Sequence, residues 1–155
     1  MQPTENPNEN PEPAAVQAAE FVVERKVRFE DCDPAGIVFF PNYLRMLNSV
    51  VEDWLEALGC PWTELVTVRR TGTPTAQLDT RFLAPSVFGE TLSFHLTVEK
   101  LGTSSLILRH EARGKDKTRL RARQVIVATS LETHGAQPWP EDVRQAITRF
   151  MENTR

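Results

Sequence analysis

Cysteine is scarce in this chain, and the long apolar runs that cross membranes are missing. The 155 residues contain only two cysteines, Cys32 and Cys60, which are too few for a disulfide framework or a cysteine zinc site. No apolar stretch approaches the roughly 20 residues of a membrane span. The N-terminus lacks the basic start and apolar core of a secretory signal. These absences predict a cytoplasmic protein with reduced thiols and no membrane contact.

An excess of positive charge is also missing. Eighteen Lys and Arg residues face 21 Asp and Glu residues, so the net charge is −3. A nucleic-acid-binding domain is normally basic, so we expect no nucleic-acid partner. The histidines His95, His110 and His134 have no metal-ligand spacing, and we expect no metal and no cofactor. His110 continues an apolar parity and is predicted to be a hydrogen-bonded core residue.

The chain is predicted to form one domain behind a short tail. Residues 1–18 are rich in Pro, Asn, Glu and Ala, offer little to bury, and are expected to be disordered. Residues 19–155 have the length of a single compact domain. From Phe21 onward, apolar residues alternate with charged ones as far as Phe29, which predicts a half-buried strand.

The clearest periodicity predicts one long helix over residues 41–58. Apolar residues recur there at spacings of three and four through four turns, as in a helix with one apolar face. Pro41 suits the first turn, and Gly59 suits the position just past the end. Trp54 belongs to the apolar series and is expected in the core.

Downstream of residue 75 the period changes to two, which predicts a run of strands. Leu92 to Val98 alternate cleanly, as do Leu106 to Arg113, and a last strand includes Val125 and Val127. The turns at Gly102-Thr103 and 114–116 are short, so these strands should be antiparallel. Residues 141–151 are predicted to form a short helix. The expected class is α+β, with the long helix packed on an antiparallel sheet.

Two carboxylates lie on a tight turn just before the long helix. The run at residues 31–43 reads DCDPAGIVFFPNY, with Pro34 and Gly36 in the turn. This order places Asp31 or Asp33 beside the free backbone N–H groups of a helix N-terminus. Such a carboxylate can attack a carbonyl carbon, or direct water at it, while the N–H groups hold the carbonyl oxygen. Taken alone, however, two aspartates near a helix start are often only turn formers and caps.

The same thirteen residues resemble the signature of the 4-hydroxybenzoyl-CoA thioesterase family, and residues 72–74 (GTP) add a weaker match. The resemblance covers about residues 20–150. It implies a hot-dog fold, in which an antiparallel sheet wraps around one long helix. It also implies hydrolysis of an acyl-CoA thioester, with coenzyme A as part of the substrate. Subunits of this family usually pair into dimers with active sites at the interface, and dimers often form tetramers.

Carried over by position, the resemblance assigns the site residue by residue. Asp33 is the catalytic carboxylate, and the backbone N–H of Phe40 is the donor to the thioester oxygen. Gly36, Asn48 and Thr73 are expected to bind substrate. Many family members have His where Phe40 stands, so no imidazole is expected in this site. Aryl-specific members can carry an acidic residue at the position of Asn48, and its neutrality leaves benzoyl or another aryl group open.

Several readings of the sequence stay open. Asp33 could be a nucleophile or a general base. A second possible catalytic set is Glu52, Asp53 and Glu56 on the long helix. Cys32 is flanked by carboxylates that raise its pKa, so it is expected to be structural. A non-catalytic acyl-CoA-binding module is the alternative to an enzyme. Arginines that could meet coenzyme A phosphates, or merely form solvated faces, are Arg69, Arg70, Arg119, Arg121 and Arg123.

Overall fold

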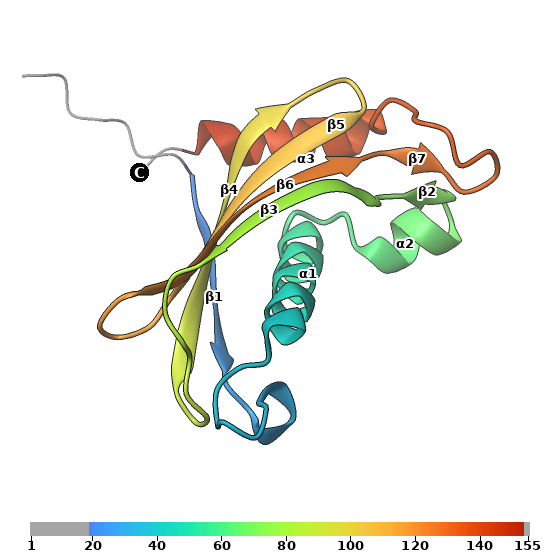
Figure 1. The fold of residues 1–155 in the computed structure, drawn as a ribbon. Coiled ribbons are helices and arrows are strands. Elements are labelled where there is room, and N and C mark those ends of the chain that lie inside the picture. Colours follow the sequence, from blue (N-terminus) through green and yellow to red (C-terminus); the bar gives the residue numbers. More distant parts are fainter. Residues whose placement is uncertain (1–18, 154–155) are drawn as a thin grey trace, which may run out of the picture.

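Five antiparallel strands and one long helix make up most of the molecule (Figure 1). The computed structural model describes residues 19–153, and the tail expected over residues 1–18 lies outside them. The elements are β1 (Phe21–Lys26), a 3₁₀ turn (Phe29–Asp31), α1 (Phe40–Ala57), α2 (Trp62–Thr67), β2 (Thr71–Gly72), β3 (Thr75–Phe82), β4 (Thr91–Leu101), β5 (Ser105–Arg113), β6 (Thr118–Val127), β7 (Thr129–Ser130) and α3 (Glu141–Glu152).

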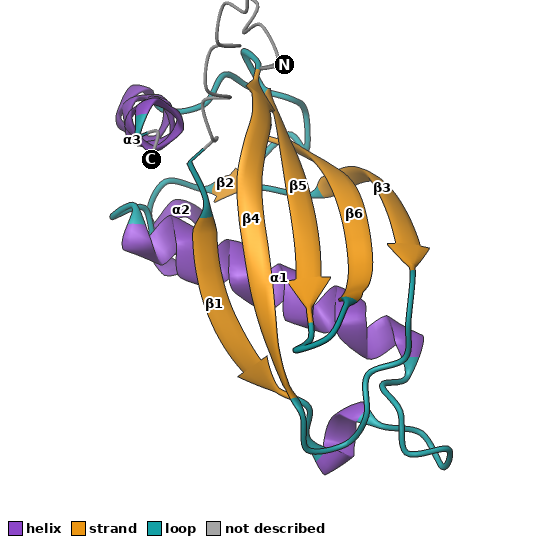
Figure 2. Ribbon diagram, turned by 90° about the vertical axis from the view of Figure 1, so that its left-hand side faces the viewer, coloured by secondary structure: helices purple, strands orange, loops and turns teal. Residues whose placement is uncertain are grey.

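The main sheet has the strand order β1-β4-β5-β6-β3, and all its neighbours are antiparallel. It curves around α1, which crosses its concave face, while the other face carries no helix (Figures 1 and 2). The small pair β2–β7 lies beyond the C-terminal end of α1 (Figure 1). The predicted α+β arrangement of one sheet around one long helix is therefore confirmed.

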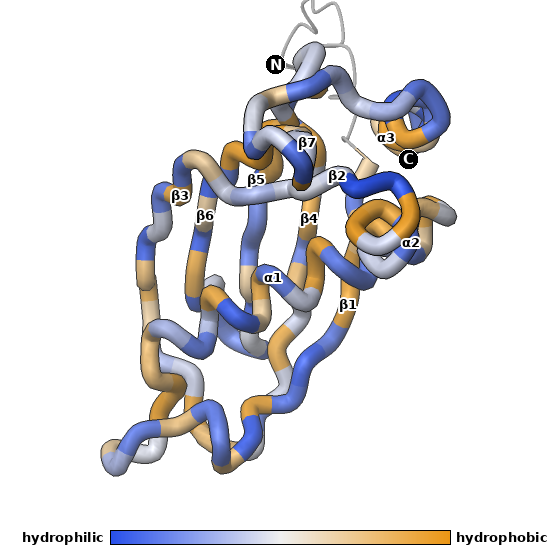
Figure 3. Tube along the Cα trace, turned by 90° about the vertical axis from the view of Figure 1, so that its right-hand side faces the viewer, coloured by the Kyte–Doolittle hydropathy of each residue, from blue (hydrophilic) through white to orange (hydrophobic). Residues whose placement is uncertain are grey.

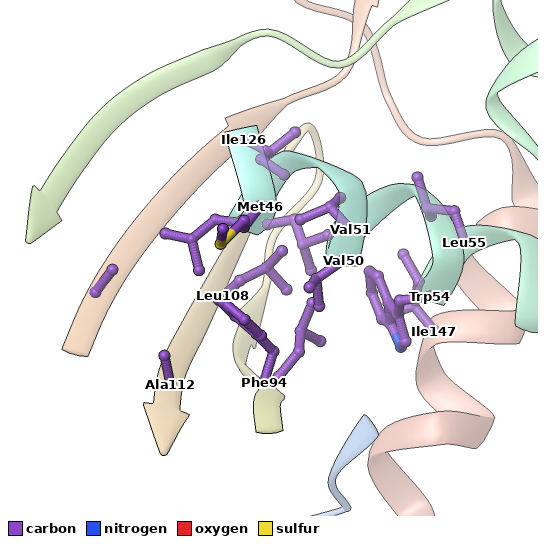
Figure 4. Packing of buried hydrophobic residues seen from close by; sticks show 14 of the residues in the cluster. Met46, Val50, Val51, Trp54, Leu55, Phe94, Leu108, Ala112, Ile126 and Ile147 are labelled. Atoms are coloured by element: carbon purple, nitrogen blue, oxygen red, sulfur yellow. The ribbon is translucent and has the colours of Figure 1, made fainter. Parts of the chain in front are cut away.

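The helix α1 buries one face, as its periodicity predicts. Seven of its residues are buried against the sheet and α3, and Trp54 among them is fully buried. Figure 4 shows Met46, Val50 and Trp54 directed into a cluster with strand residues and Ile147. The Trp54 ring meets Phe150 of α3 edge-on at 5.4 Å between centroids. Each such side chain contributes about 1.5–3 kcal/mol to folding, so α1 and α3 are fixed mainly by this apolar cluster.

The two faces of the sheet differ because alternate residues point to opposite sides. Figure 3 shows hydrophobic and hydrophilic positions alternating along the strands. Side chains turned toward α1 include Leu92, Phe94, Leu96, Leu106, Leu108, Leu120 and Ile126. The last strand was expected around Val125 and Val127, but these two are only half buried, and Gln124 and Ile126 point inward instead.

Other expectations need correction. Phe29 does not extend the first strand: β1 ends at Lys26, and Phe29 begins a 3₁₀ turn with 82% of its surface exposed. The six-residue helix α2 was missed, because it is too short to establish an apolar period. The ends of α1 are one residue earlier than predicted. Gly59 takes a left-handed conformation (φ 80°) just past the helix, as expected of a C-terminal glycine.

His110 is a core residue of β5, as its parity predicts, and only 4% of its surface is exposed. Its Nε2 lies 2.8 Å from Oε1 of Gln124, and Nε2 of Gln124 donates to Oγ1 of Thr75 at 2.8 Å. Because Gln124 offers its oxygen to the ring, Nε2 of His110 is the nitrogen that carries the proton. Burial lowers the pKa of His110, and the hydrogen bond with Gln124 opposes this shift.

This histidine predicts a loss of stability on mild acidification. Below its ordinary pKa of about 6.5, the unfolded chain binds a proton at His110 that the folded chain resists. The free energy of unfolding should therefore fall as the pH drops below 6.5, by up to about 1.4 kcal/mol per pH unit from this group. Urea unfolding at pH 7.5 and pH 5.5 measures the difference. His110→Phe should show a smaller difference between the two pH values, and an equal one would refute the assignment.

Candidate active site

The turn before α1 is held by backbone hydrogen bonds on both sides. The N–H of Gly36 donates to the carbonyl of Asp33 at 2.9 Å, and the N–H of Asp33 donates to the carbonyl of Ile37 at 3.0 Å. Gly36 has φ 77°, a left-handed conformation that favours glycine. Cys32 bridges to Val38 across the turn. These contacts fix where the Asp33 side chain leaves the backbone.

One carboxylate oxygen of Asp33 is used by the turn and the other is free. Oδ1 accepts the N–H of Ala35 at 2.9 Å, a local turn contact that orients the carboxylate. Within residues 19–153, Oδ2 has no hydrogen-bond partner, and the residue is half buried. Asp33 therefore has one unengaged carboxylate oxygen in the turn that precedes α1.

The N–H of Phe40 is a free donor at the start of α1. Pro41 has no N–H, and the N–H of Asn42 donates to the carbonyl of Phe39 at 2.8 Å. Within residues 19–153, no acceptor is paired with the N–H of Phe40. The first N–H groups of a helix lack partners inside it and carry the positive end of its dipole. This amide can thus hold an oxygen that gains negative charge.

A buried brace, which the sequence did not reveal, locks the turn to the rest of the fold. Ser86 is fully buried, its carbonyl accepts the N–H of Val38 at 2.9 Å, and its Oγ accepts the Tyr43 hydroxyl at 2.6 Å. The carbonyl of Asp31 accepts both the N–H of Phe39 and the side chain of Asn42, each at 2.9 Å. No periodic signal marks Ser86, because it lies in the loop between β3 and β4.

Asp31 is a turn residue, as the sequence favoured. It is buried, and its Oδ2 accepts the N–H of Arg28 at 2.8 Å. Burial raises the pKa of the Cys32 thiol, and the Asp31 and Asp33 carboxylates raise it further. Cys32 therefore stays a thiol near neutral pH, which agrees with the structural role expected for it.

Asn48 lies on α1 two turns beyond Phe40, a rise of about 12 Å along the axis. It is exposed and lines a cavity of about 580 Å³. Polar neighbours in the lining of this cavity are Asp31, Asn42, Arg45 and Ser49. Asn48 is thus placed where it can meet a ligand that lies along the N-terminal half of the helix.

Thr73 is not part of this cluster within one subunit. It follows β2, and its Oγ1 accepts the Trp62 Nε1–H at 2.8 Å, just beyond the C-terminal end of α1. The helix between this point and Phe40 has 18 residues, so the two ends are roughly 27 Å apart. The structure therefore places Asp33 and Gly36 in the turn that leads into α1 at Phe40, has Asn48 along the same helix, and leaves Thr73 at the opposite end.

Comparison with known proteins identifies the family. The family model of the thioesterase-like superfamily matches residues 27–147, most of the described chain. The chain belongs to the thioesterase-like superfamily. The thioesterase class and the hot-dog fold expected from the sequence are thereby confirmed.

Individual relatives of this thioesterase agree. The 4-hydroxybenzoyl-CoA thioesterase of Pseudomonas sp. (strain CBS-3) is 30% identical over 95 residues, 60% of this chain and 67% of the relative. Its solved three-dimensional structure superposes with a TM-score of 0.76 at 25% identity, covering 83% of this chain and 99% of that one. A 1,4-dihydroxy-2-naphthoyl-CoA hydrolase of Acaryochloris marina is 30% identical over 129 residues, 81% and 94% of the chains. A gentisyl-coenzyme A thioesterase structure has a TM-score of 0.75 at 28% identity, covering 82% and 99%.

The alternative carboxylates of the thioesterase lie on a different face of α1 from its core. Asp53 is ion-paired with Arg25 of β1, so it is engaged in linking the helix to the sheet edge. Glu52 and Glu56 are exposed. Neither is in the lining of the cavity beside Asn48. Asp33 is also absent from that lining, so the cavity does not decide between Asp33 and the helix carboxylates.

Several arginines considered for phosphate binding hold the thioesterase fold together instead. Arg119 is buried and reaches Asp116 at 2.7 Å, Glu90 at 3.1 Å and the carbonyl of Pro85 at 2.6 Å. Arg69 pairs with Asp142 and Glu64. Arg70 pairs with Glu132 at 2.9 Å. Arg121 and Arg123 lie on the face of the sheet turned away from α1, on the far side from the helix start.

Membrane-spanning helices and clusters of metal ligands are both absent from residues 19–153. No helix in the described part of the chain combines the length and hydropathy that a bilayer crossing requires. Over residues 19–153, no three His, Cys, Asp or Glu side chains gather as metal ligands. The cytoplasmic location stays a prediction.

Proposed function

We propose that this thioesterase hydrolyses an aromatic acyl-CoA, with Asp33 as the catalytic carboxylate and the Phe40 N–H as the donor to the thioester oxygen. The proposal rests on one observation: an acceptor and a donor without hydrogen-bond partners lie in the same short segment, the turn and the start of α1. Oδ2 of Asp33 and the N–H of Phe40 both lack partners within residues 19–153 and lie on the same turn and helix start. An oriented carboxylate and an oriented oxyanion donor are what hydrolysis of an activated acyl group requires.

The chemistry needs little else because a thioester has a good leaving group. A free thiol has a pKa near 8.5, so the thiolate can leave without a proton from an acid. In one route Asp33 forms a bond to the acyl carbon, the carbon–sulfur bond breaks, and water cleaves the resulting anhydride. In the other route, Asp33 takes a proton from a water molecule while the oxygen of that water bonds to the acyl carbon. The carbon–sulfur bond then breaks and the thiolate leaves. Both routes develop negative charge on the oxygen beside Phe40.

The aromatic acyl group is carried over from the relatives, whose names give 4-hydroxybenzoyl, 1,4-dihydroxy-2-naphthoyl and gentisyl thioesters. Aromatic side chains at the helix start support it. The ring of Phe40 meets those of Phe39 and Phe82 at 5.6 and 6.1 Å between centroids, and 57% of its surface is exposed. Such rings offer an apolar surface against which a substrate ring can stack. Comparing kcat/KM for benzoyl-CoA and a straight-chain acyl-CoA tests this part, and a preference for the straight chain would contradict it.

Selectivity for a para-hydroxyl should be weak because Asn48 is neutral. A side-chain amide can donate and accept hydrogen bonds, but it has no negative charge with which to attract a hydroxyl as a carboxylate does. The kcat/KM values for benzoyl-CoA and 4-hydroxybenzoyl-CoA should therefore agree within about tenfold, or about 1.4 kcal/mol in transition-state binding. Asn48→Asp should shift the ratio toward the hydroxylated substrate. A wild-type preference for 4-hydroxybenzoyl-CoA far above tenfold would contradict this, because it would mean that Asn48 or another group binds the hydroxyl strongly.

We further propose that the active unit is a homodimer joined through β3. This strand is one edge of the sheet, and exposed apolar side chains lie at and beyond its end, where Phe82 and Leu83 are 49% and 47% exposed. Both edges carry exposed charges, Glu24 and Lys26 on β1 and Asp79 and Arg81 on β3, so the apolar end of β3 is the feature that favours this edge. A two-fold pairing of β3 with its copy would cover the apolar edge in both subunits.

This pairing also accounts for the position of Thr73. In an antiparallel pair, the start of one strand lies beside the end of the other. The end of β3, Phe82, contacts Phe40, and Thr73 lies two residues before the start of β3. The partner subunit's Thr73 would therefore approach the Phe40 and Asp33 of this subunit. Each site would then combine residues from both chains, and association of two dimers into a tetramer stays a prediction.

A further inference from the structure

The face of the sheet turned away from α1 carries a groove lined with arginines. Figure 2 views this face, with α1 behind the strands. The groove has a volume of about 780 Å³, which is within the range of small-molecule sites. Its arginines, which alternate with inward-facing residues along three strands, are Arg81, Arg109, Arg113, Arg121 and Arg123. This face is separate from the Asp33 site, which lies at the start of α1.

Three of the five guanidinium groups are matched by carboxylates. Glu99 contacts Arg109 at 2.7 Å and Arg123 at 3.1 Å. Glu111 accepts from Arg113 at 3.0 Å. These pairs form a network along β4, β5 and β6 and need no further counter-ion.

The acidic groups that remain in the groove are also engaged. Glu20 is ion-paired with His95. Asp79 accepts from the side chain of Gln77 at 2.8 Å. Because the Gln77 amide is neutral, Asp79 keeps its charge, and the five arginines of the groove still outnumber the acidic residues in its lining, Glu20, Asp79 and Glu111.

Arg81 and Arg121 are the two arginines that carboxylates match least. They are direct cross-strand partners of β3 and β6, and both are exposed. Arg121 has one long ion pair, with Glu111 at 3.8 Å, and within residues 19–153 Arg81 has neither an ion pair nor a side-chain hydrogen bond. Like charges directly opposite each other on a sheet destabilise it. Within one subunit, the fold thus holds two guanidinium groups side by side in a groove, with only the carboxylate that Arg121 shares with Arg113 as a counter-ion.

We propose that Arg81 and Arg121 form an anion site for a ligand with two linked phosphate groups. A guanidinium group is a planar fork of donors that matches phosphate oxygens, and two adjacent forks fit two phosphates of one diphosphate better than a single carboxylate. The flanking Arg109 and Arg123, held by Glu99, add positive potential to the same groove. The groove has no exposed aromatic side chain in its lining, so recognition rests on the phosphates.

Calorimetric titration of the full chain with inorganic pyrophosphate tests the proposal. The wild type should bind it, and the double variant Arg81→Gln/Arg121→Gln should bind at least tenfold more weakly. Binding by the wild type should also weaken as salt rises. The control Arg149→Gln removes the same charge from α3 and should bind like the wild type. The melting temperature of Arg81→Gln without ligand should be unchanged or higher, because the substitution relieves repulsion.

A competition experiment identifies the source of the diphosphate. If coenzyme A displaces pyrophosphate from the wild type, the groove takes the diphosphate of coenzyme A itself. If coenzyme A does not compete, the groove takes a separate oligophosphate, and KM for acyl-CoA should be the same in the wild type and the double variant. Equal pyrophosphate affinity in the wild type and the double variant, or no binding by the wild type, would overturn the site. None of these binding results depends on turnover, so failure here leaves the Asp33 proposal intact.

Discussion

Asp33→Asn is expected to lower kcat by at least ~100-fold while the fold is kept, a loss of the size attributed to general acid–base catalysis alone. The amide has nearly the same shape and can still accept the Ala35 N–H through its oxygen, so the turn should survive. It lacks the negative charge that either route requires. Steady-state kinetics on the best acyl-CoA substrate, with circular dichroism as the check on folding, measures the effect.

The matched control variants remove the charge of two other carboxylates that were considered as catalytic, Glu52 and Glu56. Glu52→Gln and Glu56→Gln make the same chemical change on the exposed face of α1 and should leave kcat within about twofold of the wild type. If a folded Asp33→Asn protein kept near-normal turnover, the assignment of Asp33 would be wrong. If Glu52→Gln or Glu56→Gln lost activity instead, the helix carboxylates would be the catalytic ones.

Dissociation of the dimer is expected to abolish activity, because each site would need Thr73 from the partner subunit. Leu83→Asp adds a charge to the apolar end of β3 at a side chain that is already 47% exposed, so the monomer should tolerate it. Burying that charge at a β3–β3 interface without a counter-charge is costly, and the dimer should weaken. Light scattering at low micromolar concentration, with activity measured on the same samples, follows both changes.

The control for this variant is Val22→Asp, on the far edge strand β1, where the side chain is 48% exposed. It should remain dimeric and active. A wild-type protein that is fully active as a 17.6 kDa monomer would overturn both the dimer and the shared site. A Leu83→Asp protein that stays dimeric and active would place the interface somewhere other than β3.

The elements predicted correctly are those whose residues repeat at the period of a buried face. Met46, Val50 and Trp54 follow the helical period because α1 packs one side on the sheet, and His110 was assigned to the core from its parity alone. Phe29 was misplaced because its apolar side chain continued the parity of β1 although the chain had already turned away. An exposed aromatic residue beside a strand gives the same signal as a buried one.

Only part of the candidate site could be predicted from the sequence, because local rules connect only residues that are close along the chain. Asp33 and Phe40 are seven residues apart, so local turn and helix rules bring them together. Ser86 forms hydrogen bonds with Val38 and Tyr43 but lies far from them in the sequence. It belongs to no periodic pattern that would predict its burial. Thr73 lies at the opposite end of α1 within the subunit, and no local rule predicts a contact that would form between two copies.

The measurement that tests the central claim most directly is thiol release from benzoyl-CoA, followed with a thiol reagent, for the wild type and Asp33→Asn side by side. The wild type should release free coenzyme A catalytically, over many turnovers, and the variant should release at least ~100-fold less per unit time. Tight binding of benzoyl-CoA and other acyl-CoAs by the wild type without release of thiol would contradict the account, and would identify the protein as a non-catalytic acyl-CoA-binding module.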